Sequence, residues 1–232
     1  MMTKNNVARL AGFVYLLLVL TGIFYLVHVP TQLIDWGSTE TTVNNIMRAE
    51  FLFRSGIVAG VISNICFLIL PFILYELLKS VNKIYAVSMV VLAVVSVPVS
   101  LVNMINKVDV LTLLSGAQYL SVFEVEHLHG QVMLLLRSYN NGISLVQIFW
   151  GLWLFPFGAL VFKSGYLPKF LGVCLMIGCF EYLITFFSIQ LYPNVEIPSF
   201  VGYAHSIGEI GVCLWLLIMG VGDKSSKEEH VP

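Results

Sequence analysis

The sequence predicts an all-α, polytopic membrane protein built as a bundle of six transmembrane helices. Of its 232 residues, 58% are hydrophobic and only 11% are charged, and the mean hydropathy is +0.90. A soluble domain carries roughly a quarter charged residues, and a single domain of this size has too small an interior for so much apolar surface. Lipid must therefore surround much of the chain, and helices satisfy their own backbone hydrogen bonds there. The net charge of −1 argues against a nucleic-acid partner.

Six apolar stretches are long enough to cross the hydrocarbon core, which takes about 20 residues. Lys4 and Arg9 before the first stretch resemble the start of a signal peptide, but the apolar run is too long and no cleavage site follows. Pro30 is expected to end this first span. We treat residues 1–232 as a single transmembrane domain with spans at 8–28, 51–78, 84–106, 139–162, 170–191 and 200–221.

The distribution of Lys and Arg predicts the orientation. With the N-terminus inside, eight basic residues fall on the cytoplasmic side and four on the other, which is a positive-inside bias. Both termini are therefore expected in the cytoplasm, and the plasma membrane, bacterial in origin, is the expected location. The inner residues are Lys4, Arg9, Lys79, Lys83, Lys163, Lys169, Lys224 and Lys227, and the outer ones are Arg48, Arg54, Lys107 and Arg137.

The segment between the third and fourth spans, residues 107–138, is expected to be an extracytoplasmic helical segment. Residues 108–123 are too polar and too interrupted by glycine for a seventh span, although their leucines could lie on the membrane interface. Residues 124–137 are expected to extend the fourth helix outward.

Three polar residues fall near the middle of the predicted spans, roughly 15 Å from the outer ends. They are Glu209, Glu181 and Gln147, and His205 lies one helical turn from Glu209 on the same face. A carboxylate at the bilayer centre costs about 2.5–3.5 kcal/mol. We expect each glutamate either to be hydrogen-bonded or to meet a hydrated cavity.

Further polar side chains lie toward the predicted outer surface. The arginines there could simply reach the headgroups, the asparagines could be satisfied at helix ends, and Gln147 could join two helices. The functional interpretation is a polar cavity that opens outward and ends near the two glutamates. The candidate ligand-binding residues are therefore Glu209, His205, Glu181, Arg54, Arg137, Gln147 and Asn103.

The sequence contains few motifs that would indicate a metal site, a cofactor site or an enzyme. The four cysteines lie in apolar runs and form no Cys-x-x-Cys motif. Phosphate-loop, Rossmann, His-Glu-x-x-His and Gly-x-Ser-x-Gly patterns are absent, so no cofactor is predicted, and an enzyme is disfavoured but left open. A weak metal alternative combines His127, His129 and His205, but the first two diverge by about 200° if they lie on a helix. Gly56 and Gly60 form a Gly-x-x-x-Gly packing face, within one protomer more often than between two.

Several short stretches resemble a family of uncharacterised bacterial multi-pass membrane proteins, domain of unknown function 4386. The most specific is Ser164-Gly165-Tyr166-Leu167-Pro168-Lys169, before the fifth span. The resemblance covers nearly the whole chain and implies a six-helix membrane topology, but no activity. The other stretches are Ala8-Arg9-Leu10-Ala11-Gly12, Phe53-Arg54, Tyr75-Glu76-Leu77-Leu78-Lys79, Val81-Asn82, Ser115-Gly116-Ala117, Tyr119-Leu120, Leu171-Gly172, Gly208-Glu209 and Leu214-Trp215-Leu216-Leu217.

The sequence leaves three functions open. In the first, the chain binds or transports a small molecule or lipid in the outward-facing cavity, with Arg54 and Arg137 attracting an anionic headgroup and Glu209 exchanging a proton. In the second, it is an intramembrane enzyme on lipid substrates that uses Glu209 and Glu181 or a His-bound metal. In the third, it is an accessory or structural subunit that packs on a partner helix through Gly56 and Gly60. The ligand and the oligomeric state do not follow from the sequence.

Overall fold

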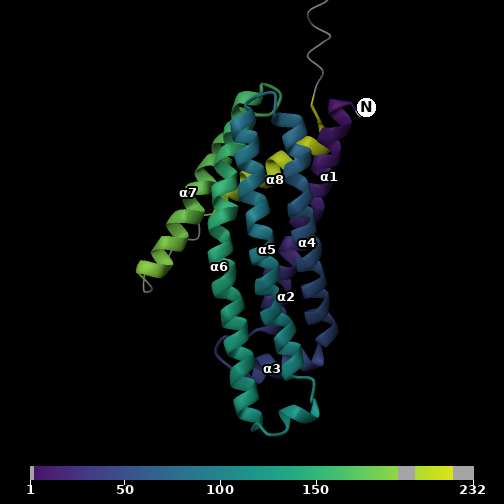
Figure 1. Cartoon of the computed structure of the whole chain (residues 1–232), viewed down its shortest axis with the longest axis vertical. Helices are drawn as coiled ribbons and strands as arrows, with labels where there is room; N and C mark the ends of the chain where they lie inside the picture. Colours follow the sequence, from purple (N-terminus) through teal and green to yellow (C-terminus); the bar gives the residue numbers. More distant parts are fainter. Residues whose placement is uncertain (1–2, 193–201, 222–232) are drawn as a thin grey trace, which may run out of the picture. The chain divides into compact units, whose positions relative to one another are not determined.

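The computed structural model describes residues 3–192 and 202–221, and every regular element in these ranges is a helix (Figure 1). The all-α fold class is confirmed to that extent. Five helical stretches are long and apolar enough to cross a membrane, as expected for a membrane-embedded protein. They are Lys4–Leu33, Glu50–Leu78, Lys83–Leu113, Val125–Ser164 and Lys169–Leu191.

A sixth apolar helix, Tyr203–Ile218, is shorter. Its 16 residues extend for about 24 Å, less than the roughly 30 Å of the hydrocarbon core. The expected span 200–221 begins in residues outside the described ranges, so the described helices alone do not give six full spans.

The described residues include six longer helices. They are α1 (Lys4–Ile23), α4 (Glu50–Leu78), α5 (Lys83–Leu113), α6 (Val125–Ser164), α7 (Lys169–Leu191) and α8 (Tyr203–Ile218). The short elements are the π-helix η1 (Phe24–His28), α2 (Val29–Leu33), α3 (Thr39–Arg48) and the 3-10 helix η2 (Gln118–Leu120).

The first helix continues past Pro30, contrary to the expectation from sequence. α1 passes into the π-helical turn η1, where the Val29 N–H donates to the Phe24 carbonyl, and then into α2. Pro30 is the second residue of α2 and directly follows the π turn. The helix ends only after Leu33, because Ile34 adopts an extended conformation.

The described residues group into two compact units, and the single transmembrane domain expected from the sequence stays a prediction. Unit 1 comprises Met1–Leu17, Cys66–Ser96 and Gln147–Pro232, and unit 2 comprises Leu18–Ile65 and Val97–Val146. Helices α1, α4, α5 and α6 contribute residues to both units. We describe each unit by itself.

The interior of unit 1 is formed by aromatic and aliphatic side chains. Trp153 stacks on Phe157, with ring centroids 5.1 Å apart, and meets the edge of Phe67 at 5.0 Å. Glycines let its helices approach closely. A Cβ atom on Gly158 of α6 would lie only 2.6 Å from the Gly172 carbonyl oxygen of α7, so any larger residue would force these two helices apart.

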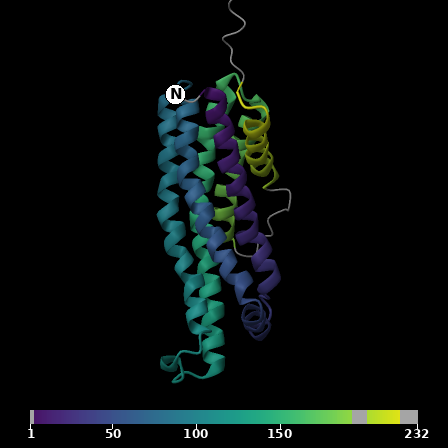
Figure 2. The same cartoon turned by 90° about the vertical axis from the view of Figure 1, so that its right-hand side faces the viewer.

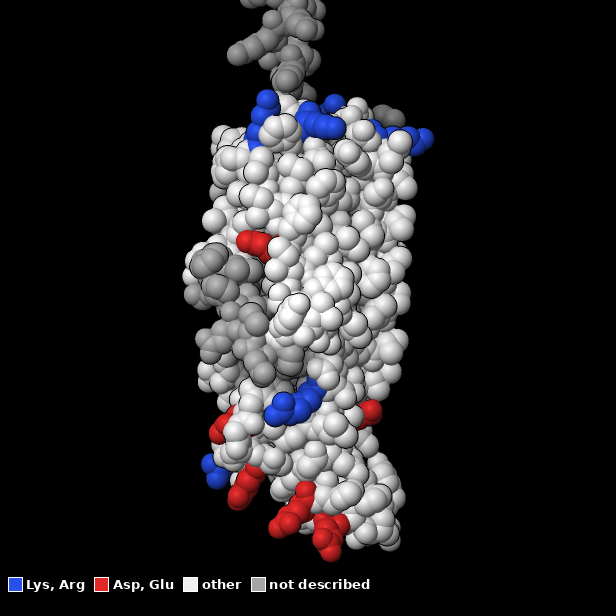
Figure 3. All heavy atoms as spheres, turned by 90° about the vertical axis from the view of Figure 1, so that its left-hand side faces the viewer, with Lys and Arg blue, Asp and Glu red and all other residues white. Residues whose placement is uncertain are grey.

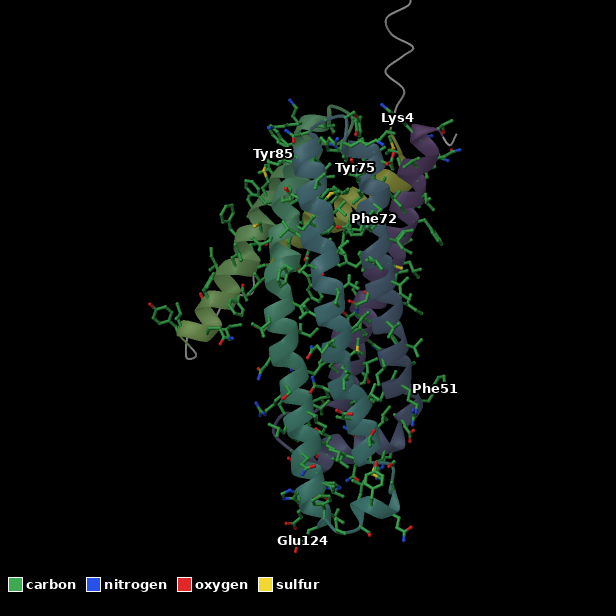
Figure 4. All side chains as sticks on the ribbon, viewed as in Figure 1. Lys4, Phe51, Phe72, Tyr75, Tyr85 and Glu124 are labelled. Atoms are coloured by element: carbon green, nitrogen blue, oxygen red, sulfur yellow. The ribbon has the colours of Figure 1, made fainter. Side chains whose placement is uncertain are left out.

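Three segments lie at the same end of unit 1: the start of α1, the α4–α5 turn and the α6–α7 turn. Figure 4 shows Lys4, Tyr75 and Tyr85 together there, and Figure 3 shows lysine and arginine spheres collected at the same end. The Lys163 ammonium lies 5.2 Å from the centre of the Tyr85 ring. These are the segments that the orientation argument placed on the cytoplasmic side.

The α6–α7 turn contacts the C-terminal end of α4. Gly165 has a φ of +74°, a conformation that favours glycine, and the Ser164 hydroxyl accepts a hydrogen bond of 3.1 Å from the Leu167 N–H. The Tyr166 hydroxyl donates to the Leu77 carbonyl at 2.8 Å, one of the carbonyls left without an intrahelical donor at the end of α4. Burial raises the pKa of Tyr166 to about 12, so its hydroxyl remains a donor at neutral pH.

In unit 2, the short helix α3 covers an apolar cluster (Figure 2). The Ser38 hydroxyl caps α3 by accepting from the Thr41 N–H at 3.2 Å. Val43 and Ile46, both fully buried, pack with residues of α2, α4, α5 and α6. Gly56 and Gly60 of α4 face Val29, Tyr25 and Met104 of the same chain.

The two helices that border the predicted outer segment both continue into it. α5 continues to Leu113, so Lys107 is part of a helix, and α6 starts at Val125, in agreement with the expected outward extension. Of the leucines placed on the interface, Leu120 is buried instead, with 7% of its surface exposed. The turn between the two helices contains η2.

We expect Tyr166→Phe to lower the free energy of unfolding of the purified protein by about 1 kcal/mol, because it leaves the Leu77 carbonyl without its donor. The thermal unfolding midpoint in detergent measures this loss. Tyr119→Phe is the matched control, since that ring is 63% exposed. Equal midpoints for Tyr166→Phe and the wild type would contradict the role of the hydroxyl.

Candidate functional site

Glu209 of α8 is held by a tyrosine of the first helix. The Tyr15 hydroxyl donates to Glu209 Oε1 at 3.1 Å, and Tyr15 has only 1% of its surface exposed. The close approach of α1 and α8 depends on Gly12, because a Cβ atom there would collide with the Leu217 backbone. The carboxylate that the sequence marked as unusual therefore has a specific partner.

Glu181 of α7 caps the start of α8. Its carboxylate accepts from the backbone N–H groups of Ala204 at 3.4 Å and His205 at 3.1 Å, two donors in the first helical turn. The positive end of the helix dipole favours a negative charge at this position. Glu181 Oε2 also lies 3.1 Å from His205 Nδ1, and the two side chains are 15% and 22% exposed.

Tyr182 completes the group of polar side chains around α8. Its ring centre lies 4.6 Å from that of His205, and Gly178 makes room for the histidine, since a Cβ atom there would collide with His205 Cβ. His205 and Glu209 are one turn apart on the same helix face. We call Tyr15, Glu181, Tyr182, His205 and Glu209 the α8 cluster.

The seven predicted ligand-binding residues are divided between the two units. Unit 1 contains Glu209, His205 and Glu181 in the α8 cluster, together with Gln147, which is half-buried on α6. Unit 2 contains Arg54, Arg137 and Asn103. Glu181 and His205 are in contact, and Glu209 lies one helical turn from His205. Whether any of the seven binds a ligand remains a prediction.

The three residues of unit 2 have partners of their own. Arg54 Nε donates to Glu50 at 2.6 Å, and both side chains are more than half exposed. Arg137 lies over the Trp36 ring, 5.4 Å from its centre. Asn103 Nδ2 donates to the Tyr139 carbonyl at 2.8 Å, so it joins α5 to α6.

Two hollows of the described surface are lined by other residues. A pocket of about 120 Å³ in unit 2 is bordered by Glu50 and Arg54, together with Ile46, Met47, Leu111, Leu114 and Ser115. An apolar groove in unit 1 runs along Val7, Leu68, Ile69, Phe72, Ile73 and Glu76. Neither includes a residue of the α8 cluster.

The histidines proposed as a weak metal alternative gain no support. His127 and His129 both lie in the first turns of α6, so their side chains point in different directions. Among the residues that the structure describes, no group of three or more His, Cys, Asp or Glu side chains is placed to hold a metal ion.

The sequence analysis missed two aromatic members of the cluster. Tyr15 lies within an apolar run and Tyr182 directly follows Glu181. A tyrosine hydroxyl buried in a span needs a hydrogen-bond partner. That rule would have made Tyr15 a candidate partner for a midspan carboxylate, although not for Glu209 in particular.

Comparisons with known proteins identify the family. The model of the family described as "Domain of unknown function (DUF4386)" matches residues 10–220. An "Uncharacterized protein" of the archaeon Archaeoglobus fulgidus is 35% identical over 91 residues, which make up 37% of this chain and 50% of that protein. The match thus spans half of that relative's length, and the expected bacterial origin of our chain stays a prediction.

No solved structure matches the chain. The family match runs from within the first apolar helix to just beyond α8 and so includes all five residues of the α8 cluster. This protein therefore belongs to the DUF4386 family, whose description supplies no activity.

Proposed function

We propose that this protein is a six-span membrane protein that binds a small molecule or lipid at the α8 cluster. One observation carries the proposal: Glu209 lies in a mostly apolar helix and accepts a hydrogen bond from the Tyr15 hydroxyl. A second carboxylate, that of Glu181, contacts His205, which lies one helical turn from Glu209. Ionisable side chains are costly inside a membrane and for that reason usually mark a functional site.

Contacts at one end of unit 1 support a topology with both termini in the cytoplasm. The Val221 N–H donates to Asn5 Oδ1 at 3.3 Å, so the two ends of the described chain meet. The basic turns beside Tyr85 and Tyr166 lie at this same end. Ends that meet on one side require an even number of crossings, and α8 provides the sixth.

The chemistry of the α8 cluster favours a cationic ligand. The cluster combines two carboxylates with two tyrosine rings and a histidine ring, and its described contacts include no Lys or Arg side chain. Carboxylates and aromatic faces both attract cations. The arginines expected to attract an anionic headgroup are engaged with Glu50 and Trp36 instead.

The two carboxylates then have different roles. Glu181 accepts from the first N–H groups of α8 and contacts His205, and so it positions α8. Glu209 has one described hydrogen bond, from Tyr15, and is the residue that exchanges a proton for the cation. Such an exchange would couple ligand binding to proton binding, as in a transporter.

We expect Glu209→Gln to weaken binding of a lipophilic cation such as tetraphenylphosphonium by about tenfold, since one buried charged contact is lost. The cation-dependent rise of the thermal unfolding midpoint measures the affinity. Tyr15→Phe keeps the Glu209 charge and should retain binding at lower stability, and Glu76→Gln, at the surface pair with Lys79, should change neither. Cation binding to Glu209→Gln at wild-type strength would contradict the proposal.

The topology is tested with single cysteines at two exposed turns, Ser80 between α4 and α5 and Ser121 between α5 and α6. A membrane-impermeant maleimide added to intact cells should label Ser121→Cys and spare Ser80→Cys until the cells are permeabilised. The wild type, whose four cysteines lie in the helices, is the background control. The opposite labelling pattern would reverse the orientation.

A further inference from the structure

Lys107 of α5 is buried inside unit 2, with only 2% of its surface exposed. It lies 24 residues after Lys83, where α5 begins, or about 36 Å along the helix. A lysine near a helix end ordinarily extends to water or to lipid headgroups. Here the side chain turns into the protein instead.

The ammonium of Lys107 faces two tyrosine rings. Its Nζ is 4.1 Å from the centre of the Tyr139 ring and 5.8 Å from that of Tyr25. Among the described residues, no Asp or Glu forms an ion pair with Lys107, and Asp109 lies on the exposed side of α5. Two ring faces recover only part of the cost of taking an ammonium out of water.

A second donor lies at this place. The Tyr139 hydroxyl is buried and has no hydrogen bond within the described structure. Its ring is held in place because Asn103 Nδ2 donates to the Tyr139 carbonyl and because Tyr139 packs with Tyr25, Ala59 and Met104. A buried polar group without a partner costs free energy unless something binds to it.

The backbone beside the two rings is unusual. Tyr25 belongs to the π-helix η1, and π-helical turns occur frequently at functional sites. Gly60 of α4 provides space here, since a Cβ atom would approach the Tyr25 ring to 3.2 Å. The Tyr25 ring that faces the Lys107 ammonium therefore belongs to a π-helical turn.

We propose that Lys107 and the Tyr139 hydroxyl bind a small monovalent anion, a halide or a carboxylate. The anion supplies the missing counter-charge to the ammonium and accepts the hydrogen bond of the tyrosine. The burial of Lys107 favours a small ion over a lipid headgroup. This site goes beyond the proposed function and involves no residue of the α8 cluster.

The test compares thermal unfolding of the full-length protein in detergent with sodium chloride, sodium acetate and sodium gluconate at equal ionic strength. Chloride or acetate should raise the midpoint relative to gluconate, which is too large for the site. A response to chloride alone identifies a halide site, and a response to acetate identifies a carboxylate site. Equal midpoints in all three salts would overturn the proposal, because a neutral, unliganded amine gives no such response.

Two variants localise the effect. Lys107→Met should abolish the salt response, while Lys83→Met, an exposed lysine of the same helix, should retain it. If Lys107→Met does not fold, Tyr139→Phe keeps the ring and removes only the hydroxyl, and it should weaken the anion affinity about tenfold. A salt response that persists unchanged in both site variants would also refute the site.

Discussion

The first turn of α8 exposes backbone N–H groups that have no intrahelical acceptor, and in an apolar environment such groups need one. Glu181 of α7 provides the acceptor and at the same time contacts His205 Nδ1. The cap thus fixes where α8 begins and how it is rotated relative to α7. That rotation determines where Glu209 lies, one turn further along α8. It therefore also allows the contact of Glu209 with Tyr15.

Small residues make these contacts possible. Gly12 lets α1 approach the α8 backbone, Gly178 admits His205, and Gly208 brings α8 against Leu175 of α7. Without a hydrophobic driving force between helices in lipid, close backbone approach and hydrogen bonds are the main sources of specific association. The polar cluster and the glycine contacts of unit 1 are therefore parts of one packing arrangement.

Much of the helical structure could be predicted from sequence, for local reasons. α4 and α7 each begin one residue before the expected span and end with it, because their apolar runs are long and clearly bounded. α3 was not predicted, although Ser38 before it and Arg48 in its last turn are ordinary helix signals. Pro30 was misread because the pattern does not reveal a π turn before it.

The candidate sites could likewise be predicted only where the local sequence is unusual. Glu181 and Glu209 could be identified because a carboxylate in an apolar run is unusual. Lys107 resembled an ordinary basic residue beyond the end of a span, and its burial depends on rings contributed by η1 and α6, far away in sequence. Since Lys107 is buried, it drops out of the four basic residues that the orientation argument placed outside, which leaves three.

The length of α6 has a practical consequence. Its 40 residues extend for about 60 Å, roughly twice the thickness of the hydrocarbon core. With Ser164 at the cytoplasmic boundary, as proposed, the turns of α6 nearest Val125 project into the aqueous phase together with the residues that precede them. An antibody fragment raised against residues 114–129 would then bind a protruding epitope, adding a recognisable mass for electron cryomicroscopy of this small protein.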